Sequence, residues 1–413
     1  MNIVHFSWEF PPVIFGGLGT FATEITQKQK ALGNDITVFS LNDSNKHKTQ
    51  DSWNGIQVYR PKNLDITSAL NLCTNQELHT WGQHFQFFSD VMGYNLFSAS
   101  TLVAILNSNG HKPYDIIDAH DWLGIIGGIV AKQAINKPLI FHVHSTEEGR
   151  SVGGGSDTIK EIEYEGGQQA DGIITVSYAM KEELKSLGFP ENKIRVCWNG
   201  IDPEKYNPHR ISEQQRKQLR KSYHITDTDI MIFFIGRLVT VKGVDKLVEA
   251  MPQIIDQYPQ VKLVILGIGD MEDALRSRIA ELNLEKSIII RAEFVDEQKR
   301  ILHYSASDIV VLPSLYEPFG IVSTEAMAMA KPVVVGARGT SGFREQIIAS
   351  GDGHCGYHVN PHDPSDIAWG IMQILQQDDQ GIQMGKNGRQ RAQDLFSWDA
   401  VAQRTLDIYS EFM

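Results

Sequence analysis

Two glutamates, Glu317 and Glu325, are separated by seven residues in the segment EPFGIVSTE. Their carboxylates can accept hydrogen bonds from hydroxyl groups. The run that leads into the segment, DIVVLP (308–313), is apolar and β-branched, which is typical of a buried strand. Pro318 disfavours a helical conformation at Glu317, so we expect a helix to begin directly after this proline.

The start of that expected helix supplies hydrogen-bond donors. The first amide groups of a helix have no partner within it, so we expect those of Phe319, Gly320 and Ile321 to face a ligand. Glu317 would accept hydrogen bonds just ahead of them, and Glu325, about two helical turns in, could accept from a pair of vicinal hydroxyls. Donors beside carboxylates suit a polyhydroxylated ligand and do not suit a metal ion.

A pair of cations follows another expected strand, in the segment FFIGRLVTVKG (233–243). Gly236 ends the strand, and Arg237 and Lys242 come just before a helix. A guanidinium and an ammonium group at a helix start suit an anion such as a diphosphate. Two solvated surface cations are the alternative, but the turn after the strand favours the phosphate site. Gly269, at the next strand end, is explained as well by a simple loop as by a ligand contact.

Glycines also follow the first expected strand, in the segment EFPPVIFGGLG (9–19). Gly16 and Gly17 allow the backbone to come close to a ligand, and the helix behind them supplies free N–H groups. A plain glycine turn that opens a helix explains the segment equally well. Its spacing differs from the G-x-G-x-x-G pattern of dinucleotide-binding proteins.

Histidines and an aspartate end two more expected strands, in DAHDWLG (118–124) and HVHSTEEGR (142–150). Asp121 and His144 are candidates for a ligand-binding edge, whereas His142 suits a buried core position. His142 and His144 would lie on one face of a strand, so a metal pair is conceivable. No third ligand is evident, and we predict no metal site.

Short apolar runs alternate with amphipathic stretches along nearly the whole chain. The runs predict strands at residues 2–7, 35–41, 115–120, 138–144, 172–177, 230–236, 262–267, 287–291, 308–313 and 332–336, and the stretches predict helices that include 21–33 and 243–259. Continuous apolar strands separated by helices indicate parallel sheets covered on both faces, that is, an α/β fold.

Residues 199–229 divide the expected strands into two groups. This segment is polar and charged and contains Pro203 and Pro208, as expected of a linker. We therefore predict two doubly wound α/β domains joined near residue 205, which agrees with a length of 413 residues. Ligands bind at the carboxyl ends of the strands in such domains, so the facing strand edges would form a cleft.

The composition argues against several classes of protein. Lys and Arg total 38 and Asp and Glu total 50, and the net charge of −12 argues against a nucleic-acid partner. The three cysteines, Cys73, Cys197 and Cys355, lie far apart, so we expect no disulfide framework and a cytoplasmic location. The N-terminus shows no signal-peptide pattern, and no apolar run is long enough for a transmembrane helix.

The motifs together resemble one family. EPFGIVSTE, GRLVTVKG, LGIGD, NGID and GGLG resemble, in identity and order, those of the retaining GT-B glycosyltransferases of the glycogen/starch synthase and family 4 type. The resemblance covers essentially the whole chain and implies two Rossmann-like domains. Residues 1–204 would form the acceptor-side domain and residues 205–395 the nucleotide-sugar-binding domain. Residues 396–413 would form a helix that crosses back to the first domain.

The resemblance also implies roles for the candidate residues. Arg237 and Lys242 would bind the diphosphate and stabilise the charge of the leaving group. Glu317 would hold hydroxyls of the donor sugar, and His144 would lie beside that sugar; these four are the candidate catalytic residues. Asp121 would lie on the acceptor side. The residues expected to bind the nucleotide sugar are Gly16, Gly17, Leu18, Gly236, Gly269, Phe319, Gly320, Ile321 and Glu325, the last through the ribose.

The function implied by the resemblance is that of a retaining hexosyltransferase. It would move a sugar, with glucose preferred, from a UDP- or ADP-sugar to a hydroxyl acceptor, with an α-glucan preferred, and would need neither a cofactor nor a metal. Two positions depart from the family. Ile14 stands where bacterial glycogen synthases that use ADP-glucose have a lysine, and Phe21 stands near a position where many family 4 enzymes have a histidine.

Three alternatives remain at this point. The first is a family 4 transferase that acts on a small molecule or a cell-surface glycan. The second is a sugar-nucleotide epimerase of the GT-B fold, which would use the same two-domain cleft. The third is a catalytically silent nucleotide-sugar sensor.

Overall fold

The computed structural model describes residues 1–108, 112–377, 379 and 381–413. The chain forms two compact units: Met1–Asn199 together with Trp398–Met413, which we call unit 1, and Gly200–Ser397, which we call unit 2. The boundaries expected from the sequence, 204/205 and 395/396, lie a few residues from these. From Gly200 on, the polar segment expected to be a linker is part of unit 2, where Tyr206 is buried.

Unit 1 is built on an eight-stranded sheet in the order β3-β4-β2-β1-β5-β6-β7-β8. Its strands are β1 (Asn2–Phe6), β2 (Asp35–Phe39), β3 (Gln50–Trp53), β4 (Ile56–Tyr59), β5 (Ile116–His120), β6 (Leu139–Val143), β7 (Gly172–Thr175) and β8 (Ile194–Val196). Neighbouring strands pair in parallel except β3 and β4, which form an antiparallel pair at one edge. The central strands β5 and β6 are buried along their whole length, which explains their continuous apolar sequences.

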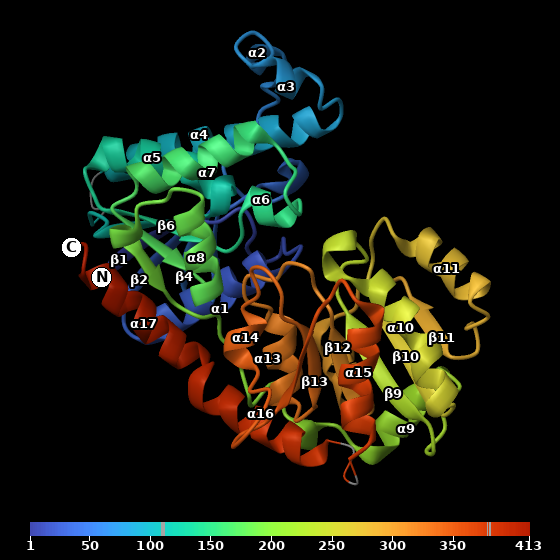
Figure 1. Ribbon diagram of the computed structural model, residues 1–413. Coiled ribbons are helices and arrows are strands. Elements are labelled where there is room, and N and C mark those ends of the chain that lie inside the picture. Colours follow the sequence, from blue (N-terminus) through green and yellow to red (C-terminus); the bar gives the residue numbers. More distant parts are fainter. Residues whose placement is uncertain (109–111, 378, 380) are drawn as a thin grey trace. The chain divides into compact units, whose positions relative to one another are not determined.

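Helices cover both faces of this sheet (Figure 1). On one face lie α4 (His84–Leu106), α5 (Asp121–Ile135) and α7 (Asp157–Gln169), and on the other lie α1 (Gly17–Ala31) and α17 (Trp398–Ser410). The shorter helices of unit 1 are α2 (Thr67–Leu70), α3 (Gln76–His79), α6 (Glu147–Arg150) and α8 (Tyr178–Ser186). Because Trp398 of α17 packs edge-on against Phe21 of α1, the end of the chain completes the core of unit 1.

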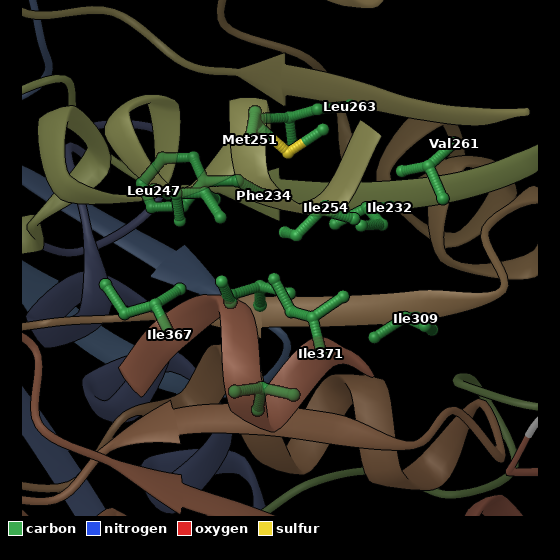
Figure 2. Packing of buried hydrophobic residues seen from close by; sticks show 14 of the residues in the cluster. Ile232, Phe234, Leu247, Met251, Ile254, Val261, Leu263, Ile309, Ile367 and Ile371 are labelled. Atoms are coloured by element: carbon green, nitrogen blue, oxygen red, sulfur yellow. The ribbon is translucent and has the colours of Figure 1, made fainter. Parts of the chain in front are cut away.

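Unit 2 contains a six-stranded, wholly parallel sheet in the order β11-β10-β9-β12-β13-β14. Its strands are β9 (Ile230–Ile235), β10 (Val261–Leu266), β11 (Ile288–Arg291), β12 (Ile309–Leu312), β13 (Val333–Gly336) and β14 (Gly356–Val359). Two helices, α10 (Val244–Gln257) and α15 (Pro364–Leu375), share one apolar core with the strands. Figure 2 shows Leu247 and Met251 of α10 and Ile367 and Ile371 of α15 in this core.

The other helices of unit 2 include two packed pairs. The remaining elements are α9 (Glu213–Ser222), α11 (Glu272–Glu281), α12 (Glu297–Ala306), α13 (Ile321–Ala328), α14 (Phe343–Gln346) and α16 (Ile382–Leu395). α9 packs against α12, and α13 packs against α16. The segment expected to be a linker therefore contributes a helix, α9, that is anchored on the body of unit 2.

Both sheets reverse their strand order at one point. In unit 1 the reversal lies between β1 and β5, and in unit 2 it lies between β9 and β12. In doubly wound folds, ligands bind outside the carboxyl ends of the strands at such a point. The loops that follow these four strands carry most of the candidate site residues.

The ten strands predicted from apolar runs are confirmed, with ends that differ by one or two residues. The helices expected at 21–33 and 243–259 are confirmed as α1 and α10. The sequence does not predict β3, β4, β8 and β14, which are short, and β3 and β8 are partly exposed. Among the helices of the described residues, none has the length and apolar character needed to cross a membrane.

Candidate active site

The best-formed group of predicted residues lies after β12 and β9 of unit 2. Glu317 Oε2 lies 2.5 Å from Lys242 Nζ and accepts a hydrogen bond of 3.2 Å from Ser314 Oγ. The two charged side chains are only 12% and 20% exposed, so water screens their attraction weakly. The structure therefore places the predicted phosphate-binding cation directly on the predicted sugar-binding carboxylate.

Helix α13 begins next to Glu317, as the sequence predicts, with Gly320 as its N-cap residue. Gly320 has a φ of 89°, and a Cβ atom at this position would overlap the ring of Phe343, so only glycine fits. Within the described part of the chain, the amides of Phe319, Gly320 and Ile321 donate no hydrogen bond to the protein. Three donors at the positive end of a helix are therefore available to a ligand.

The two glycines and the arginine predicted near the phosphate site lie at the ends of β9 and β10. Gly236 directly follows β9 and has a φ of 159°, and Gly269 lies so close to the Leu238 carbonyl that a Cβ atom would overlap it. Arg237 is exposed and makes no ion pair or hydrogen bond with the residues that the structure describes. Its guanidinium group is therefore free to bind an anion.

Glu325 has a different environment from the one expected. It is 2% exposed, and its two carboxylate oxygens accept hydrogen bonds of 2.8 Å from Tyr206 and Tyr304. Arg300 lies 3.3 Å from the carboxylate and also donates to the Tyr206 hydroxyl. The carboxylate is thus held by a network within unit 2, and its contact with a ribose stays a prediction.

In unit 1, a residue that the sequence did not point to organises the glycine loop. Glu9 Oε2 accepts hydrogen bonds from the amides of Phe15, Gly16 and Gly19, at 2.8, 2.9 and 3.2 Å. Of the three predicted amides, that of Gly16 is therefore already engaged. The amides of Gly17 and Leu18 donate no hydrogen bond within the described residues, so these two remain candidates for a ligand.

Asp121 and His144 lie side by side at the ends of β5 and β6. Asp121 Oδ1 accepts hydrogen bonds from the backbone amides of His144, at 2.7 Å, and Ser145, at 3.4 Å. Asp121 adopts a left-handed φ of 53°, which aims its carboxylate at that loop. Asp121 therefore fixes the backbone of His144, and a contact of Asp121 with an acceptor stays a prediction.

The histidines at this edge form a stack. The rings of His142 and His144 lie 4.6 Å apart and are nearly parallel, and both lie within 5.4 Å of the ring of His120. A metal ion must lie about 2.0–2.1 Å from each ligating nitrogen, close to the plane of its ring. Stacked rings have separate parallel planes, so this arrangement is a poor ligand set although the nitrogens are close together.

A buried acidic cluster surrounds Arg150 behind the His144 loop. Arg150 pairs with Glu163 at 3.0 Å and with Glu147 at 3.1 Å. Burial raises the pKa of Glu163 to about 7 and that of Asp121 to about 6, although Arg150 acts to lower both. Each of these carboxyl groups therefore has a higher pKa in the folded chain than in the unfolded chain.

Replacing Glu163 by glutamine is expected to change the pH dependence of stability. Because the folded pKa is raised, the contribution of Glu163 to stability is fully present below about pH 4.5 and is lost as the pH rises to about 7. As the pH rises across this range, the free energy of unfolding of Glu163→Gln should therefore increase relative to that of the wild type. Urea denaturation of the wild type and the variant at pH 5 and pH 7.5 measures the difference. Other titrating groups are the same in both proteins, so their contributions cancel in this difference. A constant difference between the two proteins would contradict the raised pKa.

Comparisons with known proteins agree with this architecture. A model described as Glycosyltransferase Family 4 matches residues 15–205, and one described as Glycosyl transferases group 1 matches residues 215–391. An uncharacterized glycosyltransferase of Methanocaldococcus jannaschii is 32% identical over 415 residues, which cover 99% of this chain and 98% of that protein. The chain belongs to this family of glycosyltransferases.

Two further comparisons extend the assignment. A glycogen synthase of Mycobacterium tuberculosis is 28% identical to this glycosyltransferase over 99% of the chain and 94% of that protein. The crystal structure of the Anabaena protein HepE in complex with UDP-glucose has a TM-score of 0.74 at 20% identity and covers 100% of both chains. The fold of the glycosyltransferase is thus of the GT-B type, with two Rossmann-like units.

The fold of this glycosyltransferase places some of the predicted site residues in contact with one another and keeps others apart. Lys242 and Glu317 meet beside the free amides of α13, and Asp121 meets His144. Glu325 is buried in a separate network, and Gly16 is engaged by Glu9. The sequence signal that could have pointed to Glu9 is its position after β1, at the strand end where the fold binds ligands.

Proposed function

We propose that this glycosyltransferase is a retaining hexosyltransferase that moves glucose from a nucleotide diphosphate sugar to a hydroxyl of an α-glucan. One observation carries the proposal. The loops at the β9–β12 switch point carry Arg237, the Lys242–Glu317 pair and the amides of Phe319, Gly320 and Ile321; within the described residues, Arg237 and these amides have no hydrogen-bonding partner. Cations suit a diphosphate, and a carboxylate next to amide donors suits the hydroxyls of a sugar.

The mechanism follows from where charge develops. Cleavage of the bond between the sugar carbon and the diphosphate oxygen leaves negative charge on the diphosphate and positive charge on the sugar. Arg237 and Lys242 would stabilise the leaving diphosphate, since fixed positive groups lower the barrier when they face developing charge. Glu317, released from Lys242, would accept hydrogen bonds from the sugar hydroxyls. The acceptor hydroxyl would attack on the face that the diphosphate leaves and pass its proton to a diphosphate oxygen.

The two cations and the helix amides supply the positive charge that a metal would otherwise bring. We therefore expect catalysis without a metal or a cofactor. Glu317 would anchor the sugar as a hydrogen-bond acceptor, and we do not propose it as a covalent nucleophile.

The choice of donor and acceptor rests on the relatives. HepE was solved with UDP-glucose, and one relative is a glycogen synthase, which supports a glucose donor and a glucan acceptor. Ile14 stands where synthases that use ADP-glucose have a lysine, so we favour UDP-glucose over ADP-glucose. A small-molecule or cell-surface glycan acceptor is the second candidate, because the Glycosyltransferase Family 4 model matches residues 15–205.

A donor screen tests the proposal. The protein is titrated with UDP-, ADP- and GDP-glucose by calorimetry and then incubated with each donor and a maltooligosaccharide primer. Mass spectrometry should show primers extended by hexose units, and NMR of the product should show the α-anomer. Free UDP with a 2-epimerised sugar and no extension would indicate an epimerase. Donor binding without any turnover would indicate a sensor, and either result would refute the transfer reaction.

A further inference from the structure

A chain of hydrogen bonds runs through the interior of unit 1 from Gln29 to His144. Gln29 Oε1 lies 2.9 Å from His5 Nε2, and His5 Nδ1 lies 3.2 Å from His120 Nε2. His120 Nδ1 in turn lies 3.2 Å from His144 Nε2. The four residues come from α1, β1, the end of β5 and the loop after β6, and only His144 is partly exposed. The chain thus connects a fully buried amide to the one histidine that a ligand can reach.

Burial favours the neutral form of the three histidines in this series of hydrogen bonds. Burial lowers the pKa of His5 and of His144, and it lowers that of His120 to about 3, although Asp118 acts to raise it. A neutral imidazole has one N–H group and one lone pair. A ring that bonds through both nitrogens must therefore donate on one side and accept on the other. It follows that the group at the buried end sets the direction of every bond in the chain.

The Gln29 amide lies at that end with Oε1, 2.9 Å from His5 Nε2, facing His5. Its buried Nε2 makes no hydrogen bond within the described residues. The Tyr409 hydroxyl of α17 donates its only proton to Asp118 Oδ2, and Gln29 acts to lower the pKa of this hydroxyl, which burial raises. That direction is the one expected of a nearby N–H group, so it agrees with an amide whose nitrogen is on the Tyr409 side. Because Oε1 can only accept, His5 carries its proton on Nε2.

The same reasoning applies to the next two rings, His120 and His144. His5 Nδ1 has the lone pair, so His120 carries its proton on Nε2 and donates it to His5. His120 Nδ1 then has the lone pair, so His144 carries its proton on Nε2 and donates it to His120. The remaining nitrogen of His144, Nδ1, has a lone pair and makes no hydrogen bond within the residues that the structure describes.

We propose that Gln29, His5 and His120 are positioning residues that hold His144 in the Nε2–H tautomer, so that His144 offers Nδ1 as a hydrogen-bond acceptor to a hydroxyl group of a sugar ligand. The ligand part of this inference rests on the proposed function, and the tautomer does not. Phe21 supports the arrangement from the side, because its ring packs edge-on against His144 with the ring centroids 4.7 Å apart. The chain therefore fixes both the orientation and the hydrogen-bonding character of His144.

His142 is not part of this chain. Its Nδ1 lies 3.4 Å from Asp118 Oδ2, which can only accept, so His142 carries its proton on Nδ1. His142 and His144 are therefore expected to be opposite tautomers although their rings stack. This contrast gives the test an internal reference.

The test is NMR spectroscopy of the ligand-free chain labelled with ¹⁵N-histidine. Long-range proton–nitrogen correlations distinguish a protonated from a bare ring nitrogen, and the spectra of His142→Gln and His144→Gln assign the two residues. His144 should show a protonated Nε2 and a bare Nδ1, and His142 the reverse. A His144 ring with a protonated Nδ1 and a bare Nε2 would overturn the proposal, whether or not the protein transfers glucose.

Variants of the buried end complete the test. Gln29→Met removes the acceptor with little change of shape, so the His144 signals should move toward a mixture of tautomers. With the donor found in the screen, kcat/KM should fall about five- to tenfold, as expected for one lost hydrogen bond. Gln29→Glu keeps an acceptor and should keep the Nε2–H tautomer. Gln27→Met, on the same helix, should change neither the spectrum nor the rate. Unchanged His144 signals in folded Gln29→Met would contradict the role of Gln29. If this variant does not fold, the tautomer of His144 in the wild-type spectrum is the deciding observation.

Discussion

Replacing Lys242 by alanine is expected to lower kcat by a factor of about 10²–10³, the usual effect of removing one fixed donor that faces developing charge. Lys242 ends a short 3₁₀ helix (Thr240–Lys242), two residues before α10, and contacts Glu317 at 2.5 Å. During transfer its ammonium group would follow the negative charge onto the diphosphate. The loss should therefore appear in kcat more than in KM, because the interaction strengthens in the transition state. Steady-state kinetics with the donor identified by the screen measures both constants.

Lys246 offers a matched control for this variant. It lies four residues after Lys242, in the first turn of α10, and its ammonium group pairs with Asp245 and Glu249. Lys246→Ala should keep kcat within about twofold of the wild type, since such partly exposed pairs contribute little. The double variant Lys242→Ala/Glu317→Gln should lose little more than Lys242→Ala alone if the two side chains act as a unit. A rate for Lys242→Ala close to that of the wild type, with the fold intact, would remove Lys242 from the site.

Most of the fold could be predicted from the sequence, because the central strands are buried on both faces and read as continuous apolar runs. IMIFFI became β9 and IVVL became β12 with ends that differ by at most one residue from the prediction. The edge strand β3 lacks this signal, because its sequence QDSW is mostly exposed, and it was not predicted. The helix α9 was also missed, because the charged sequence of its segment, with two prolines before it, is typical of a linker.

The candidate site could be predicted where one local segment supplies all of its parts. Glu317, Gly320 and the α13 amides lie within five residues, so the strand, the proline and the glycine fix their arrangement. The buried networks could not be predicted, because their members are distant in the sequence. The Tyr409 hydroxyl reaches Asp118 across 291 residues, and Tyr206 reaches Glu325 across 119. Spacing along the chain carries no information about such pairs.

Replacing Glu325 by alanine is expected to lower the free energy of unfolding by about 3–5 kcal/mol, the usual cost of removing one partner of a buried ion pair. Its carboxylate accepts from Tyr206 and Tyr304 and pairs with Arg300 at 3.3 Å, while only 3% of its side chain is exposed. Without it, the two buried hydroxyls lose their shorter hydrogen bonds and keep only the longer ones, to Glu297 at 3.3 Å and the Val322 carbonyl at 3.2 Å. The guanidinium group loses its closer and more buried counter-charge. Urea denaturation of the wild type and the variant measures the difference. Glu297→Ala, on the same helix as Arg300 but with a side chain 40% exposed, is the control and should cost less than about 1 kcal/mol.

The same residue allows the structural and the ligand-binding roles to be separated. Glu325→Gln keeps the shape and one acceptor oxygen, so it should lose less stability than Glu325→Ala and remain folded for binding assays. If Glu325 also holds the ribose, this variant should bind UDP about tenfold more weakly, as expected when a charged hydrogen-bond acceptor is replaced. It should also lose the preference of the wild type for UDP over its 2′,3′-dideoxy analogue. Calorimetry with both nucleotides decides: equal losses of affinity for the two ligands, or no loss, would show that Glu325 only supports the fold. In that case Tyr206 and Tyr304, which already donate to its two oxygens, would account for its burial without a ligand.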